Sequence, residues 1–339
     1  MTDKRLGIFT RILDDASPAM RYRNATEQIQ LAERLGLDSA WVAQHHFSRD
    51  EGGLPAPLVF LSHVAAQTER IRLGTAIITL PLEQPLRVAE DASVLDVLSG
   101  GRLELGLGSG GTPKSFTAFG LDAAEKRVVF AGHLQVLLDA LEGKDLAHPQ
   151  NQLYPPAPGL LGRIWQATFS VDGGARAGAR GDGLMLSRTQ PRPADAPDAT
   201  LSDIQNPIID AYLEALPAGA EPRILASRTV YVSEDRAGTR AFAETGLRRV
   251  VQGLRRQGHH IPEDDVDSLI RRTDSYVGTP DEVAVALSRD TAAARSTDVS
   301  VQVHSIDPPH EDVLRSIELF ATEVAPALGW RPALAAATR

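Results

Sequence analysis

Short apolar runs alternate with longer amphipathic segments along almost the whole chain, and this alternation is the feature that most constrains the fold. An apolar run of roughly four to eight residues between amphipathic stretches is typical of a strand buried in a parallel sheet. We therefore expect eight strands, each followed by a helix. The expected strands lie at 6–9, 39–43, 71–78, 103–107, 164–168, 184–187, 224–232 and 299–303.

Right-handed crossovers curl eight such units into a closed barrel, so the expected fold class is α/β, a (β/α)8 TIM barrel. A doubly wound open sheet shows the same alternation and remains an alternative at this point. We expect one domain over residues 1–330, with insertions near residues 188–205 and 257–280 over a barrel face. Residues 331–339 are expected to form a frayed tail.

Composition excludes several classes of function. The 35 Lys and Arg residues against 44 Asp and Glu residues give a net charge of −9 in 339 residues, which argues against nucleic-acid and anionic-membrane partners. The chain has no cysteine, so disulfides, thiolate metal sites and cysteine nucleophiles are excluded. No apolar stretch reaches the roughly 18–20 residues that a membrane span needs. A cytoplasmic protein is the expectation.

Two histidines follow the second expected strand, where barrel active sites are assembled, in the segment Gln44-His45-His46-Phe47. Side chains alternate along a strand, so one imidazole should face the barrel axis and the other should face away. This divergence argues against a shared metal ion, and we expect no metal. A hydrogen-bonded structural histidine beside an exposed one is the alternative interpretation.

A glycine-rich segment ends the fourth expected strand, and Gly106, Gly108 and Gly111 formally match a dinucleotide fingerprint. That fingerprint needs a helix that opens at the glycines, and the next helix is expected only near Arg127. A strand end that lets a flat ring approach the backbone is the better physical explanation. A tight turn without a ligand is the alternative.

A third segment, from Thr168 to Gly174, precedes a short helix. Ser170 and the amides of Gly173 and Gly174 could form an anion site at the helix N-terminus, provided that Asp172 faces solvent. A plain N-cap is the alternative. Arg127 and Arg188 are the candidate cationic partners of a phosphate.

Three segments resemble one known family. Residues 35–47 (LGLDSAWVAQHHF), 73–81 (LGTAIITLP) with 85–90 (PLRVAE), and 95–108 (LDVLSGGRLELGLG) are similar to luciferase-like flavin-dependent monooxygenases, in the same order and spacing. The close similarity covers roughly residues 6–130. The resemblance implies a (β/α)8 barrel with reduced FMN, or a related deazaflavin, across the carboxyl ends of the strands.

The resemblance also implies roles for single residues. His45 matches the catalytic histidine of the family, and a cis peptide against the flavin ring would fall at Ala76–Ile77. Arg127 and Ser170 match phosphate-binding positions. Bacterial luciferase has a reactive cysteine and an arginine where this chain has Gly108 and Ser109, beside the cofactor. A second phosphate cation must then come from elsewhere, and Arg188 is the candidate.

The activity that the resemblance implies is oxidation of a small organic substrate with O2 and reduced FMN from a separate flavin reductase. His45 would be an acid–base group or a hydrogen-bond donor with a pKa near neutrality. A homodimer is expected. The alternatives are hydride transfer with a deazaflavin, a non-catalytic flavin-binding subunit and a metal-dependent barrel hydrolase.

Overall fold

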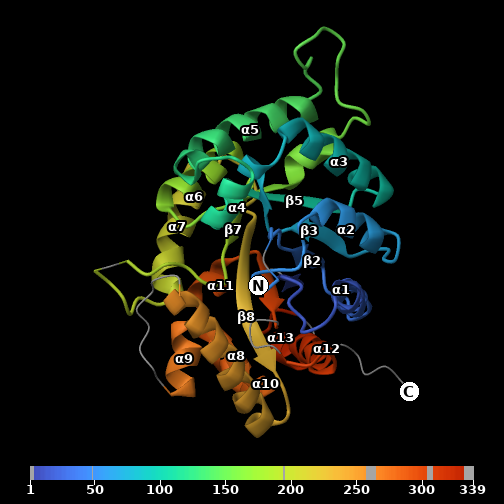
Figure 1. Cartoon of the computed structure of the whole chain (residues 1–339). Coiled ribbons are helices and arrows are strands. Elements are labelled where there is room, and N and C mark those ends of the chain that lie inside the picture. Colours follow the sequence, from blue (N-terminus) through green and yellow to red (C-terminus); the bar gives the residue numbers. More distant parts are fainter. Residues whose placement is uncertain (1–3, 48, 194, 257–264, 304–307, 332–339) are drawn as a thin grey trace.

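In the computed structural model, which describes residues 4–331 apart from 48, 194, 257–264 and 304–307, eight parallel strands close into a barrel (Figure 1). The barrel order is β1, β2, β3, β5, β6, β7, β8 and β10, and β10 pairs with both β8 and β1. The expected (β/α)8 barrel is confirmed, and the open sheet is excluded. The strands are β1(Arg5–Thr10), β2(Ser39–Val42), β3(Arg72–Thr75), β4(Ile78–Thr79), β5(Leu103–Gly108), β6(Ile164–Ala167), β7(Gly183–Leu186), β8(Ile224–Val232), β9(Ser275–Gly278) and β10(Asp298–Gln302).

Helices cover the outside of the barrel (Figure 1). The main apolar core lies between strands and helices, where Leu6 and Ile8 of β1 pack in one cluster with Ile29 of α1. The α-helices are α1(Pro18–Arg34), α2(Pro57–Ala65), α3(Pro85–Leu98), α4(Pro113–Ala118), α5(Lys126–Leu141), α6(Val171–Arg180), α7(Leu201–Ala215), α8(Arg236–Arg256), α9(Val266–Arg272), α10(Pro280–Ser288), α11(Thr291–Arg295), α12(His310–Leu319) and α13(Ala325–Ala327). Short 3-10 turns η1(Leu80–Leu82), η2(Ala123–Glu125) and η3(Pro158–Arg163) and the π-helical turn η5(Phe320–Val324) complete the set of described elements.

Two tryptophans fill the inside of the barrel. Trp41 of β2 and Trp165 of β6 meet edge to face, with ring centroids 5.5 Å apart. A Cβ on Gly74, the neighbour of Trp41 in β3, would lie 2.1 Å from the Trp41 ring, and a Cβ on Gly183 would lie 2.2 Å from the Trp165 ring. Two glycines therefore make room for two large rings, which plug the barrel beneath its carboxyl end.

The expected third strand, 71–78, is interrupted in the structure. It divides into β3 and β4, and the five residue steps from 73 to 78 lie opposite four steps of β5, from 103 to 107. The side chain of Thr75 spans the irregular stretch: its Oγ1 accepts from the amide of Gly106 at 2.9 Å and donates to the carbonyl of Gly106 at 2.8 Å. The chain thus bulges at the mouth of the barrel while its polar backbone stays bonded.

The expected insertions are confirmed only in part. The segment near residues 188–205 leads from β7 into α7 through turns. The segment near 257–280 contains α9 and a further strand, β9, which pairs with the end of β8, so it is not a plain insertion; residues 257–264 lie outside the described part. Arg331, expected in the frayed tail, donates to Asp38 Oδ2 at 2.5 Å, and residues 332–339 lie outside the described part.

Candidate active site

The carboxyl ends of the strands form a mouth above the two tryptophans. Phe9, Ala76, Ile77 and Ala167 pack on the tryptophans and are only partly buried, so they form an apolar floor that a ligand could cover. The peptide bond between Ala76 and Ile77 is cis, as the resemblance implied. Gly108 lies against the same floor, because a Cβ there would stand 2.8 Å from the Ile77 side chain.

His45 faces this mouth. Alternation along β2 places Trp41, Ala43 and His45 on the inner face. Gly52 lies against the imidazole, since a Cβ at that position would be 2.4 Å from His45 Nδ1, and Nδ1 is buried without a hydrogen-bond partner. Nε2 is therefore the ring nitrogen that a ligand can reach.

His46 points elsewhere, as alternation predicted. Its ring packs against Phe119, at a centroid distance of 5.0 Å, and against Phe47, at 5.8 Å. The two imidazoles therefore do not converge. Among the described residues no group of three or more His, Asp or Glu side chains could hold a metal ion.

The protonation state of His45 differs from the expectation. Burial, together with the nearby charges of Arg11 and Arg188, lowers the pKa of His45 to about 3. The expected value near neutrality is wrong because desolvation and cationic neighbours both disfavour the imidazolium. At neutral pH the free protein presents a neutral imidazole, which can donate one hydrogen bond and accept another.

Ser170 caps α6, and the cap uses amides that we expected to bind an anion. The amide of Gly173 donates to Ser170 Oγ at 3.2 Å, and that of Gly174 donates to the Ser170 carbonyl at 3.1 Å. Both glycines are also required for packing: a Cβ at 173 would be 1.9 Å from Thr168 Oγ1, and one at 174 would be 2.6 Å from the backbone of α7. Asp172 is exposed, as an anion site requires. An anion would therefore meet the start of α6 and the Ser170 hydroxyl rather than the Gly173 and Gly174 amides.

Arg127 stands at the start of α5, after the loop that contains Ser109. Its side chain is exposed, and no hydrogen bond or ion pair holds it within the described part of the chain. Lys126 Nζ donates to the Gly110 carbonyl at 2.9 Å and ties the start of α5 to the glycine-rich loop. A short helix, α4, opens before α5, whereas we expected the next helix only near Arg127. Ser170 directly follows β6, whereas Arg127 follows the adjacent β5 only after α4 and η2.

Arg188 lies in a different part of the mouth. Its Nη1 donates to Thr229 Oγ1 of β8 at 3.3 Å, and its charge acts on His45 across the mouth. Burial and the charge of Arg11 lower the pKa of Arg188 to about 9, so the guanidinium is still protonated at neutral pH. The structure thus groups Arg188 with Arg11 and His45, and no interaction found among the described residues links it to Arg127 or Ser170.

A family model for luciferase-like monooxygenases matches residues 5–295. The chain belongs to the luciferase-like monooxygenase family. Its relatives in this family include the uncharacterized protein y4vJ of Sinorhizobium fredii, which is 30% identical over 92% of this chain and 93% of its own length. The 4-hydroxyprotoasukamycin monooxygenase of Streptomyces nodosus subsp. asukaensis is 28% identical over 91% of this chain and 87% of its own.

Solved structures share the fold of this luciferase-like chain. The monooxygenase RslO1 of Streptomyces bottropensis is 26% identical, with a TM-score of 0.77 over 95% of this chain and 99% of its own. The oxygenating constituent of 3,6-diketocamphane monooxygenase of Pseudomonas putida, solved with FMN, is 18% identical, with a TM-score of 0.78 over 99% and 100%. The coenzyme F420-dependent tetrahydromethanopterin reductase of Methanopyrus kandleri is 19% identical, with a TM-score of 0.65 over 96% and 100%. The last two likenesses show the shared fold alone; one of these proteins was solved with FMN and the other depends on coenzyme F420.

Sequence reasoning missed three residues at the mouth of this luciferase-like barrel. Arg11 comes two positions after the inward-facing Phe9, so strand alternation could have found it. Thr229 faces the mouth from β8, where it accepts the Arg188 hydrogen bond. Gly52 lies in a loop, and its contact with His45 depends on tertiary structure that the sequence pattern does not carry.

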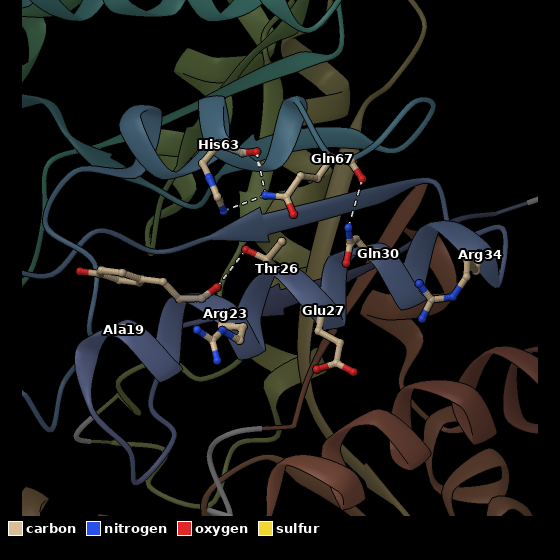
Figure 2. A pocket seen from close by; sticks show the side chains of 9 residues that line it. Ala19, Arg23, Thr26, Glu27, Gln30, Arg34, His63 and Gln67 are labelled. Carbon is tan, nitrogen blue, oxygen red and sulfur yellow. Dashed lines mark hydrogen bonds between the residues drawn. The ribbon is translucent and has the colours of Figure 1, made fainter.

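An open hollow of about 580 Å³ lies on the outside of the barrel, between α1 and α2 (Figure 2). Its side chains are mostly polar and come from helix surfaces, among them Arg23 and Arg34 of α1 and His63 of α2. The hollow stands away from the strand ends where the expected site residues gather, so we do not assign the cofactor to it. None of the helices in the described part of the chain has the length and apolar character that crossing a membrane requires.

Proposed function

We propose that this chain is a monooxygenase that uses reduced FMN and O2 to oxidise a small organic substrate. The observation that carries the proposal is the mouth itself, where an apolar floor with the Ala76–Ile77 peptide lies beside the partly buried His45. A flat, largely apolar ring fits such a floor, and Gly108 keeps the floor free of a further side chain. Family membership with named monooxygenases supports the same function.

The chain's own residues divide the task of holding FMN. Ala76, Ile77 and Gly108 would carry the ring, and Arg127 with the Ser170 hydroxyl and the start of α6 would hold the phosphate. When bound, the flavin supplies electrons and activates O2, and one oxygen atom passes to the substrate while the other leaves as water. The plugged barrel beneath the floor keeps water from reaching the ring from below.

His45 would act at the face of the flavin. Its neutral Nε2 can donate a hydrogen bond to, or accept one from, a group on the substrate or cofactor. Gly52 holds the ring from behind, so the imidazole is oriented before a ligand arrives. A proton-transfer role would need a bound anion that raises the pKa again.

Replacing Arg127 with alanine is expected to weaken FMN binding about 10–100-fold, because one charge-assisted phosphate contact contributes roughly 1.5–3 kcal/mol. Quenching of FMN fluorescence during titration measures the affinity. Arg23→Ala, which removes an exposed arginine in the α1–α2 hollow, is the matched control (Figure 2). An unchanged affinity in the Arg127 variant would remove this residue from the site.

Reconstitution decides between FMN and a deazaflavin. The purified chain is titrated with each cofactor and followed by absorbance, and oxygen uptake is then screened with the reduced complex and candidate substrates. FMN binding with substrate-dependent oxygen uptake supports the proposal. Turnover with the reduced deazaflavin without oxygen would establish hydride transfer instead, a function that the F420-dependent structural neighbour keeps open. Cofactor binding without any turnover would indicate a non-catalytic subunit.

The partners complete the proposal. We infer that the chain forms a homodimer and receives reduced FMN from a separate flavin reductase. Exposed apolar side chains on the adjacent helices α2 and α3 support association through these two helices. They are Val59 of α2 and Val94, Val97 and Leu98 of α3. Light scattering measures the mass of the protein in solution, and a mass equal to that of a single chain would contradict the dimer.

A further inference from the structure

The mouth of the barrel has two unlike halves. Along β3, β5 and β6 it is apolar, with Ala76, Gly108 and Ala167 at the surface. Beyond Phe9 of the floor, the side of β1, β2, β7 and β8 carries polar and cationic side chains, which are Arg11, His45, Arg188 and Thr229. The proposed flavin covers the first half and leaves the second half for the rest of the reaction.

Arg188 carries a positive charge that no carboxylate of its own balances in the described part of the chain. Its hydrogen bond there goes to a neutral acceptor, the hydroxyl of Thr229. The charge of Asp274 attracts it, but Asp274 is already paired with Arg192. The guanidinium has five N–H donors, so most of them remain available to a ligand.

Two further groups make the same half electropositive. Arg11 donates to the backbone carbonyl of Glu51, and its charge acts on both Arg188 and His45. His45 offers Nε2 as a neutral donor, because Gly52 covers the other ring nitrogen. A guanidinium fork beside a second cation and an imidazole donor is a suitable arrangement for an oxyanion.

We propose that the substrate carries a carboxylate or a similar oxyanion, which Arg188 binds in the mouth while Arg11 and His45 stand beside it. This inference rests on the proposed function, which assigns the apolar half of the mouth to the flavin. The inference itself assigns Arg188 to the substrate rather than to the cofactor phosphate. The proposed ligands of the phosphate are instead Ser170, which follows β6, and Arg127 at the start of α5.

The test uses simple carboxylates and their neutral counterparts as probes. Benzoate and hexanoate, with benzamide and hexanamide as controls, are titrated by calorimetry into the whole chain with and without FMN. We expect the carboxylates to bind and the amides to bind at least about tenfold more weakly. Arg188→Met should weaken carboxylate binding about 10–100-fold, Arg188→Lys should retain part of it, and Arg23→Met should leave it unchanged. Far-UV circular dichroism confirms that each variant is folded.

Each other outcome contradicts either the inference or the proposed function on which it rests, in a recognisable way. Equal binding of amides and carboxylates, or no carboxylate binding with or without FMN, overturns it. A loss of FMN affinity in Arg188→Met with carboxylate binding intact makes Arg188 a phosphate ligand of the cofactor. A loss of carboxylate binding in Arg23→Met moves the anion to the α1–α2 hollow (Figure 2). Carboxylate binding that depends on Arg188 in a chain that does not bind FMN contradicts only the proposed function.

Discussion

Replacing Gly74 with alanine is expected to destabilise the chain by roughly 2–4 kcal/mol, since overpacking a filled interior forces rings or backbone out of place. The new Cβ would lie 2.1 Å from the Trp41 ring, which also packs edge to face against Trp165. Urea unfolding followed by tryptophan fluorescence measures the change in the free energy of unfolding.

The matched control is Gly132→Ala in α5, where an added Cβ meets no heavy atom within 4 Å. That change should be neutral or stabilise the chain by up to about 1 kcal/mol, because alanine favours a helix over glycine. Trp41→Leu should relieve part of the destabilisation caused by Gly74→Ala, so the effects of the two changes on the free energy of unfolding should be non-additive. If Gly74→Ala unfolds at the same urea concentration as the native chain, the packing of Trp41 in the barrel interior is wrong.

The barrel could be predicted from the sequence because its strands are buried on both faces. Ile224–Val232, for example, is a strand with the expected bounds. The strand β9 was missed because Ser275–Gly278 has no apolar run; it is held by its pairing with β8. The break in 71–78 was missed because a bulge leaves the apolar pattern unchanged.

The candidate site, too, could be predicted from the sequence only in part. The position of His45 at a strand end and its inward direction follow from alternation, and the cis peptide at Ala76–Ile77 follows from the family resemblance. The charge around His45 does not follow from either. Arg11 and Arg188 are separated by more than half of the chain, and their common effect on one imidazole arises only when the barrel closes.

The positive charge around His45 predicts that the free energy of unfolding depends on pH. The pKa of His45 is about 3 in the folded chain, below the ordinary value of 6.5 that it has when unfolded. Between these values the unfolded chain binds a proton that the folded chain does not bind, so stability is lost as the pH falls from about 6.5 towards 3. At pH 5 the loss due to His45 should be roughly 2 kcal/mol relative to pH 7.

Comparison of the native chain with His45→Gln isolates this contribution, since other groups titrate equally in both. Urea unfolding at pH 7 and pH 5 should show that the variant loses about 2 kcal/mol less than the native chain. His63→Gln, at an exposed position of α2, is the control and should follow the native chain (Figure 2). Equal losses in the native chain and the His45 variant would contradict the buried, neutral state of His45.

The same measurement tests whether the charges that face His45 lower its pKa. These are the charges of Arg11, Arg188 and His46. Removing one cation by Arg188→Met should raise the pKa of His45 and reduce the loss between pH 7 and pH 5, because one of the causes that disfavour the imidazolium is gone. Saturating benzoate should act in the same direction by neutralising the cationic half of the mouth. A pH dependence of the native chain that neither change alters would show that burial alone, and not the charge of the mouth, holds His45 neutral.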